Sequence, residues 1–376
     1  IGKDHSPRFI RVLTGTQRGF ERDALAIDPV FAGFRANPER QPPSETHYLI
    51  ATAAGEVGAD LDADHLICDL TPLDSMIQRF GRVNRLGLGA ARIDLVVSGK
   101  EPKADAEKSR LKLTLAYLKA RPVNEEGYPS LSPIALTDQP ADAYTATPET
   151  VPLAPHWLDM WAMTSIPASD WRDRPEVAPW LHGVVDDLPE TWVVWREDIS
   201  WLGDPKQVSA QDCAKVLDVY PVFSHEQLRE PTGRIWKADK GKPQACKLLS
   251  LMQQEGKAEK PVLLLRNDGG IAWRGALEKL VLDATEGKVS LAFSTLLLPA
   301  KMGGLSHQGT FEPHVHDKAE DVADLGPGAG RKRFNARVED DQWVAYPGSH
   351  PGEEPAYVAP TRSELIAAIV QTEKLK

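Results

Sequence analysis

The chain contains few cysteines. Its 376 residues include only Cys68, Cys213 and Cys246, which lie far apart in the sequence. An odd number of widely spaced cysteines excludes a disulfide framework and a CxxC metal site. Cys68 lies in an apolar stretch, which indicates a core residue. Cysteine chemistry therefore gives no indication of function.

Long apolar runs are also absent. No stretch is long enough to cross a membrane, and no signal peptide is recognisable. These absences predict a soluble, cytoplasmic protein without membrane association. The composition, 41% hydrophobic and 26% charged, suits packed cores, and the length suggests two to three domains. Because the chain begins at Ile1 rather than methionine, we expect a fragment or a processed product.

The chain has no excess of positive charge. It carries 44 Lys and Arg against 54 Asp and Glu, a formal net charge of −10. A nucleic-acid enzyme of this charge must concentrate its basic residues locally. One such concentration exists, because residues 79–92 contain four arginines and residues 75–93 contain no acid. These arginines therefore have no acidic partner in their own segment.

The stretch 48–87 has the densest set of local signals. Apolar residues predict strands at 48–52 and 65–70, separated by a turn of small residues. Pro72 suits the first turn of a helix and Gly87 suits its end, so we predict a helix between them. On a 3.6-residue period the apolar residues of this helix share one side. The polar residues that converge on the opposite side are Gln78, Arg82 and Arg85.

A basic helix face has two interpretations. It can be a solvated surface, because charged residues are mostly exposed. It can also bind an anion, because each guanidinium presents a fixed fork of donors that matches phosphate oxygens. Two such forks on one face can stabilise a phosphoryl group during transfer. The residues alone leave both interpretations open.

The order of these pieces resembles the second RecA-like domain of superfamily 2 helicases. ATAAGEVGADLD, residues 51–62, resembles their motif V, and QRFGRVNRLG, residues 78–87, resembles their motif VI. The residues of the two motifs most resemble those of the helicase-nuclease family that degrades target DNA in type I CRISPR interference. A softer likeness to a variant branch of that family covers LTGTQRGFERD, WLDMWAMTS and RPEVAPWLHG.

The resemblance and the alternation of strands with helices predict an α/β fold. We expect the doubly wound parallel sheet of a RecA-like helicase C-terminal domain, followed by a linker and a smaller α+β accessory domain. The expected parts are an N-terminally incomplete second RecA-like domain (1–100), a helix with an extended linker (101–155), a tryptophan-rich accessory segment (156–225) and a C-terminal α+β accessory domain (226–376).

Seven tryptophans lie close together in the accessory segment. Their rings could stack on unpaired bases, or they could pack the segment against a neighbouring domain. We favour packing, because few basic residues accompany them. The seven are Trp157, Trp161, Trp171, Trp180, Trp192, Trp195 and Trp201.

Two further segments have weaker chemical signals. Residues 307–324 contain histidines and acids, the ligand types of first-row metals, and His316-Asp317 resembles the pair that names HD nucleases. We predict no metal site, because ligand types without geometry do not make one. An HD nuclease of the family would lie beyond Lys376 or in a separate protein. The glycine-rich loop 326–333 does not match a phosphate loop.

The resemblance implies an ATP-dependent single-stranded DNA translocase, or helicase, of CRISPR antiviral defence. Arg82 and Arg85 would be arginine fingers on the γ-phosphate, and Gln78 would help to place that phosphate or its attacking water. Gly58 and Asp60 would meet the nucleotide from the motif V turn. Asp60 would contact the ribose or be coupled to the fingers.

The resemblance also implies contacts with DNA. Thr52 would touch a DNA phosphate, and Thr14, Gly15 and Thr16 resemble a loop that contacts the DNA backbone. The expected partners are single-stranded DNA and a CRISPR surveillance complex.

The other half of an ATP site is missing from this sequence. Neither GxxxxGK[ST] nor a DExH box occurs, although hydrolysis of ATP with Mg²⁺ requires both. We therefore expect the Mg²⁺ ligands on a separate first RecA-like domain, and we expect this chain alone to be inactive. Two alternatives stay open. One is another superfamily 2 DNA or RNA helicase, and the other is a non-enzymatic docking subunit that uses Trp157 to Trp201 as its contact surface.

Overall fold

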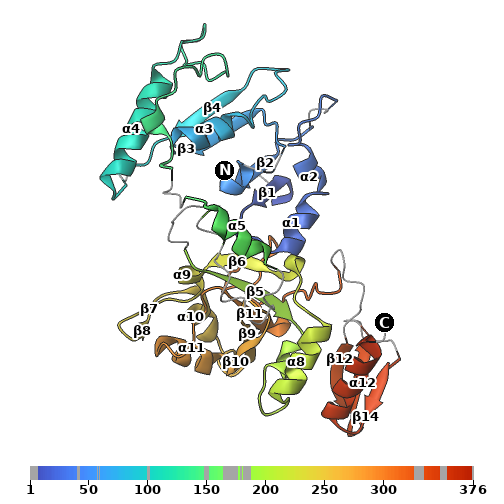
Figure 1. Cartoon of the computed structure of the whole chain (residues 1–376). Helices are drawn as coiled ribbons and strands as arrows, with labels where there is room; N and C mark the ends of the chain where they lie inside the picture. The colour runs from blue at the N-terminus through green and yellow to red at the C-terminus, as the bar shows by residue number, and fades with distance from the viewer. Residues whose placement is uncertain are drawn as a thin grey trace. The chain divides into compact units, whose positions relative to one another are not determined.

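The computed structural model divides the chain into two compact units, each built from segments distant in the sequence (Figure 1). Unit 1 comprises Ile1–Gly33, Gln41–Ala54 and Leu188–Lys376, and unit 2 comprises Phe34–Arg40 and Gly55–Asp187. The residues that the structure describes are 7–39, 43–56, 58, 60–99, 102–147, 152–163, 177, 180, 188–325, 334–347 and 354–374. Trp171 and the glycine-rich loop 326–333 lie outside them.

The N-terminal part of unit 1 is built on two parallel strands. In this pair, Leu13 lies opposite Ala51. Asp28 accepts a hydrogen bond from the N–H of Phe31 (2.9 Å) and pairs with Arg11 (2.8 Å), so it ties the following helix to the first strand. The elements are η1 (Pro7–Phe9), β1 (Ile10–Leu13), α1 (Gly19–Leu25), α2 (Pro29–Ala32), β2 (Tyr48–Ala51) and η2 (Ala53–Gly55).

Unit 2 contains a second parallel pair of strands, covered by helices. Leu73, Met76 and Phe80 form the buried side of α3 and pack with Cys68 and Tyr117 in one cluster. The apolar side that the sequence predicted for this helix is therefore confirmed. The elements are β3 (His65–Asp69), α3 (Leu73–Phe80), β4 (Arg92–Val96), α4 (Asp105–Lys119), η3 (Ala141–Ala143) and α5 (Pro155–Ala162).

The predicted helix from Pro72 to Gly87 is wrong in its extent, because α3 ends at Phe80. Val83 instead forms a parallel bridge with Ala63, and the N–H of Asn84 donates to the Ala63 carbonyl (2.9 Å). Asn84 also adopts a φ of 44°, which a helix does not allow. Arg82 and Arg85 therefore lie in a turn and do not share a helix face with Gln78.

The mixed α/β class is confirmed, and β1–β2 and β3–β4 are parallel as the strand–helix alternation predicted. In the described part of the chain these four strands pair only two by two. A single doubly wound sheet therefore remains a prediction.

The C-terminal part of unit 1 is a five-stranded mixed sheet in the order β10-β9-β11-β5-β6. Only β11 and β5 run parallel. β5 lies inside this sheet, so the predicted tryptophan-rich segment 156–225 contributes a strand to the predicted C-terminal domain. The strands are β5 (Glu190–Arg196), β6 (Leu228–Pro231), β9 (Pro261–Leu265), β10 (Ile271–Ala276) and β11 (Ser294–Pro299).

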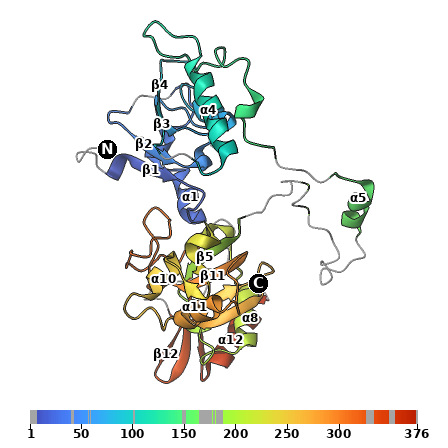
Figure 2. The ribbon, with the colours of Figure 1, turned by 90° about the vertical axis from the view of Figure 1, so that its left-hand side faces the viewer.

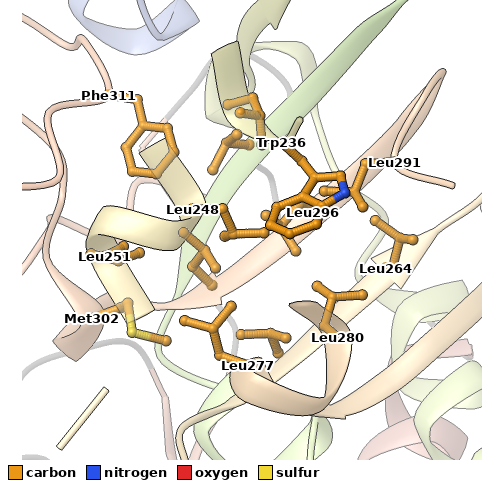
Figure 3. Close-up of a cluster of buried hydrophobic side chains, with 14 of the residues drawn as sticks. Trp236, Leu248, Leu251, Leu264, Leu277, Leu280, Leu291, Leu296, Met302 and Phe311 are labelled. Atoms are coloured by element: carbon orange, nitrogen blue, oxygen red, sulfur yellow. The ribbon is translucent and has the colours of Figure 1, made fainter. Parts of the chain in front are cut away.

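Helices cover both faces of this sheet (Figure 2). Side chains alternate between the faces, so Val193 packs with α10 and α11, whereas Val194 packs with α8 and α12. Leucines fill most of the α10–α11 side, and Figure 3 shows them around Trp236 and Phe311. The helices are α7 (Ile199–Leu202), α8 (Ala210–Val219), α9 (Thr232–Ile235), α10 (Lys247–Met252), α11 (Leu277–Thr285) and α12 (Arg362–Lys374).

Short elements complete unit 1. β12, β13 and β14 form an antiparallel sheet whose Ala345 and Ala359 join the core with α12. The remaining elements are η5 (Ser224–Glu226), β7 (Ala238–Asp239), β8 (Lys242–Pro243), η6 (Ala300–Met302), β12 (Phe334–Glu339), β13 (Gln342–Pro347) and β14 (Tyr357–Ala359).

Two tryptophans of unit 1, Trp195 and Trp201, are packing residues. Trp195 is 1% exposed, its Nε1 donates to the Gly303 carbonyl (2.8 Å), and its ring meets Phe311 edge to face. Trp201 is also buried. In unit 2 the rings of Trp157 and Trp161 both contact Trp180, each with centroids 5.2 Å apart.

The start of α1 is docked onto the C-terminal part of unit 1. Arg18 is 1% exposed, and its Nη1 donates to the Glu320 carbonyl (2.7 Å). The Arg18 N–H donates to the Gly309 carbonyl (2.7 Å), and the Gln17 amide donates to the Gln308 carbonyl (2.8 Å). A Cβ on Gly19 would lie 2.6 Å from a backbone oxygen, so only glycine allows this approach.

No helix among the described residues is both long enough and apolar enough to cross a membrane.

Candidate functional site

The arginines after β3 are held in three ways, although the sequence indicated no local partner for them. Arg79 and Arg85 pair with carboxylates of distant segments, and Arg82 bonds a distant backbone carbonyl. Arg92 pairs with its neighbour Asp94, just beyond the acid-free stretch. Arg79 is half-buried on α3, with Nε 2.8 Å from Glu56 Oε1 and Nη1 2.8 Å from Asp69 Oδ1. Burial lowers the Arg79 pKa, but hydrogen bonds and charge from both carboxylates outweigh it and raise this pKa above its usual value. Arg79 therefore stays charged and ties the turn at Glu56 to β3.

Arg82 is bound to the same turn through the backbone. Its Nη2 donates to the carbonyl oxygen of Glu56. Its Nε is buried, and it has no hydrogen-bond partner in the part of the chain that the structure describes. A buried donor without a hydrogen-bond partner lowers the free energy of unfolding. The Arg82 guanidinium is thus anchored to the turn at one nitrogen.

Arg85 is fixed at both its backbone and its side chain. Its N–H donates to Asp62 Oδ1 (2.7 Å), and Asp62 is buried. Its Nε lies 2.9 Å from Asp60 Oδ1, and its Nη1 donates to the Gly81 carbonyl (3.2 Å). The side chain is nevertheless 42% exposed. The turn therefore presents the Arg85 guanidinium to solvent in a defined orientation.

The sequence did not assign roles to Glu56 and Asp62. Both are buried acids in a turn of small residues. A buried carboxylate needs a charged or hydrogen-bonding partner. The available signal was the presence of acids in a segment rich in glycine and alanine, upstream of an arginine-rich segment. Each partner lies 23 residues away, however, for both Arg79–Glu56 and Arg85–Asp62.

The other residues expected at the nucleotide lie on the surface of unit 2. Gly58 is exposed with a φ of 84°, a conformation that favours glycine. Gln78 is exposed on α3, and Asp60 is 69% exposed. Unit 2 thus brings Asp60 to Arg85, while Gly58 and Gln78 remain accessible to solvent.

The residues expected to contact DNA come together in unit 1. Thr14 and Thr52 follow the ends of neighbouring parallel strands, and the Thr52 N–H donates to the Leu13 carbonyl (3.1 Å). The hydroxyls of Thr14 and Thr16 lie 3.4 Å apart across exposed Gly15. Ligands of parallel sheets bind at the carboxyl ends of strands. These four residues therefore form one candidate phosphate-contacting edge.

The histidine- and acid-rich segment 307–324 makes structural contacts. Asp321 Oδ2 accepts from the Glu197 N–H (2.8 Å), Val322 is buried, and the segment receives Arg18. Among the described residues no group of three His, Cys, Asp or Glu side chains could hold a metal ion.

A family model supports the resemblance that the motifs predicted. Residues 20–87 match the model described as CRISPR-associated nuclease/helicase Cas3, C-terminal. This segment is similar to the C-terminal helicase region of that family. It spans most of α1, the strands β2 and β3, the helix α3, and Arg79, Arg82 and Arg85. No curated protein matches the chain.

Solved structures of CRISPR proteins are also similar to parts of the chain. T. fusca Cas3 with AMPPNP matches at 15% identity and a TM-score of 0.35, over 80% of this chain and 33% of that one. A CRISPR-associated protein matches at 18% identity and a TM-score of 0.32, over 62% and 30%. A CRISPR RNA-guided surveillance complex in a pre-nicking state matches at 15% identity and a TM-score of 0.33, over 80% and 35%. The chain spans about a third of the length of these proteins.

Proposed function

We propose that this chain is the C-terminal part of an ATP-dependent single-stranded DNA translocase of CRISPR antiviral defence. The observation that carries the proposal is the anchored arginine pair. Arg82 and Arg85 lie in the Cas3-like region, bound to the turn that contains Glu56 and Asp60. Guanidinium groups held in this way suit the stabilisation of charge on a transferring phosphoryl group.

The nucleotide would bind between this face and a first RecA-like domain of the same protein. That domain would supply the phosphate loop and the Mg²⁺ ligands, since neither motif occurs in this sequence. Arg82 and Arg85 would act as arginine fingers, with the exposed Gln78 near the γ-phosphate or its attacking water. Gly58 and Asp60 would meet the nucleotide from the motif V turn.

The same chain would contact the translocated strand. Thr14, Gly15, Thr16 and Thr52 form the candidate phosphate-contacting edge of unit 1. ATP binding would close the arginine face on the first domain, and hydrolysis would release it. Each cycle would then shift the phosphate contacts of this edge relative to those of the first domain. A CRISPR surveillance complex would deliver the DNA, and an HD nuclease would cut it.

The test compares ATP hydrolysis, with and without single-stranded DNA, for this chain and for a protein that adds the upstream phosphate-loop domain. We expect no activity from the chain alone and DNA-stimulated activity from the longer protein. In the longer protein Arg85→Ala should lower turnover by on the order of 10³-fold or more. Arg92→Ala is the matched control, because Arg92 is exposed and pairs with Asp94 on β4.

Each outcome separates the proposal from its alternatives. Near-normal turnover of Arg85→Ala would remove the finger assignment. A preference for RNA over DNA stimulation would indicate another superfamily 2 helicase. Absence of ATP hydrolysis by both proteins would favour a non-enzymatic docking subunit. That alternative has one observation in its support, because α5 is apolar and none of its residues is buried.

A further inference from the structure

A cavity of about 310 Å³ opens on the sheet of unit 1, on the side that α8 covers. Its floor is a row of residues on three neighbouring strands. Leu265 of β9 lies opposite Thr295 of β11, which lies opposite Trp192 of β5. Residues directly opposite each other in a sheet present their side chains to the same face. Leu217 of α8 closes one side.

Polar side chains complete the lining of this cavity. Gln227 directly precedes the edge strand β6, and Asn267 lies in the turn between β9 and β10. Arg266 stands beside Asn267, is 57% exposed and pairs with Asp268. The cavity thus combines an aromatic ring, an apolar wall, two amides and a hydroxyl.

Side chains of these kinds bind flat heterocycles in proteins. An indole provides a face for stacking, and stacking on aromatic side chains is how proteins hold unpaired bases. Each amide offers both donors and an acceptor, which match the edge of a base. The volume lies at the lower end of the range for small-ligand sites, which suits a base with its sugar.

The place of the cavity in unit 1 connects it with the candidate phosphate-contacting edge. The Gln227 carbonyl accepts from the Gly19 N–H (3.0 Å). Gly19 is three residues after Thr16, a distance that the chain spans within about 11 Å. A strand whose phosphates touch Thr14 to Thr16 would therefore pass close to the mouth of the cavity.

We propose that this cavity, lined by Trp192, Gln227, Asn267 and Thr295, holds one unstacked base of the single strand bound at the Thr14–Thr16 loop. The proposal rests on the proposed DNA-translocating function. It assigns base contact to the C-terminal part of unit 1, where the sequence favoured packing for Trp192 over stacking on bases. The exposed Arg266 guanidinium at the mouth would lie near the phosphate of the same nucleotide.

The test measures binding of two labelled strands of equal length by fluorescence anisotropy on the full chain. One strand is oligothymidylate, and the other has the same sugar–phosphate backbone without bases. We expect wild type to prefer oligothymidylate by about 5- to 150-fold. Gln227→Ala and Asn267→Ala should each weaken oligothymidylate binding by about 2- to 12-fold and leave abasic binding unchanged. Gln227→Ala keeps the backbone bond to Gly19.

The control is Gln253→Ala, which removes an exposed amide after α10, outside the cavity. It should bind both strands as wild type does, and thermal melting should show all three variants folded. Equal binding of the two strands by wild type would overturn the cavity proposal while leaving the proposed function intact. Equal losses for both strands in the variants would also overturn it.

Failure of the proposed function has a different signature. Wild type would then bind neither strand. In that case we would titrate thymidine monophosphate and follow the side-chain amide NMR resonances of Gln227 and Asn267. Shifts in both resonances would support a base-binding cavity independent of translocation. Unchanged resonances would overturn the cavity proposal as well.

Discussion

Arg85 and Asp60 form an ion pair that joins the turn after α3 to the segment before β3, with Nε 2.9 Å from Oδ1. Both side chains are substantially exposed, so the pair contributes little to stability. Its consequence is geometric, because it orients a guanidinium that the backbone bond to Asp62 already places.

Asp60→Ala should therefore lower ATP turnover without unfolding the protein. In the longer protein with its phosphate-loop domain, we expect turnover to fall on the order of 10- to 100-fold, since loss of orientation is costly in catalysis. The thermal midpoint should stay within about 1 °C, because exposed pairs contribute little. Asp94→Ala, which frees Arg92, is the control and should leave both quantities unchanged. Unaltered turnover in Asp60→Ala would show that the backbone bond to Asp62 and the Gly81 contact place Arg85 without Asp60.

Glu56→Ala should destabilise unit 2. It leaves half-buried Arg79 without one of its two carboxylates, and only Asp69 remains. We expect a loss of about 1–3 kcal/mol in the free energy of unfolding, measured with urea. Glu56→Gln keeps an acceptor for Arg79 Nε and should lose less. If both variants were as stable as wild type, the turn that contains Glu56 would be held by the Arg82 and Arg85 contacts instead.

Arg18→Ala should be among the most destabilising substitutions in unit 1. Arg18 is buried, and its loss removes the bonds to Glu320 and Glu21 and leaves polar groups unpaired. A loss of about 3 kcal/mol or more is expected from urea unfolding. Arg22→Ala, on the exposed side of the same helix, should stay within about 0.5 kcal/mol. A small loss in the free energy of unfolding of Arg18→Ala would contradict the docking of α1 on the C-terminal part of unit 1.

Asp74 should make the stability of unit 2 depend on pH in the acid range. Burial raises the Asp74 pKa, but two 3.0 Å hydrogen bonds from Thr145 lower this pKa by more than burial raises it. The folded-state pKa therefore lies below the usual value. Stability from Asp74 is then present above about pH 4 and is lost as the pH falls through the folded-state pKa.

Asp74→Asn should lower stability by about 1 kcal/mol at neutral pH and flatten the acid part of the stability profile. Urea unfolding at a series of pH values measures both effects. Asp142→Asn, at an exposed position of η3, is the control. A profile of Asp74→Asn parallel to wild type would contradict the role given to Asp74.

The sequence by itself determined the local elements and the family resemblance. The apolar pattern predicted the strands at 48–52 and 65–70 within one residue of their ends, and it predicted the buried side of α3. The family model for residues 20–87 then confirmed the resemblance of the motifs. Alternation of apolar and polar residues depends only on neighbours in the chain, so the sequence contains this information directly.

Only the tertiary structure decided where the functional side chains lie. The pairing of Val83 with Ala63 ends the helix before Arg82 and Arg85, and periodicity carries no signal for a bridge between distant segments. Arg18 finds Glu320 across 302 residues of sequence. The cavity beside Trp192 exists because β5, β9 and β11 align in register. These features depend on contacts between residues far apart in the chain, which local propensity cannot specify.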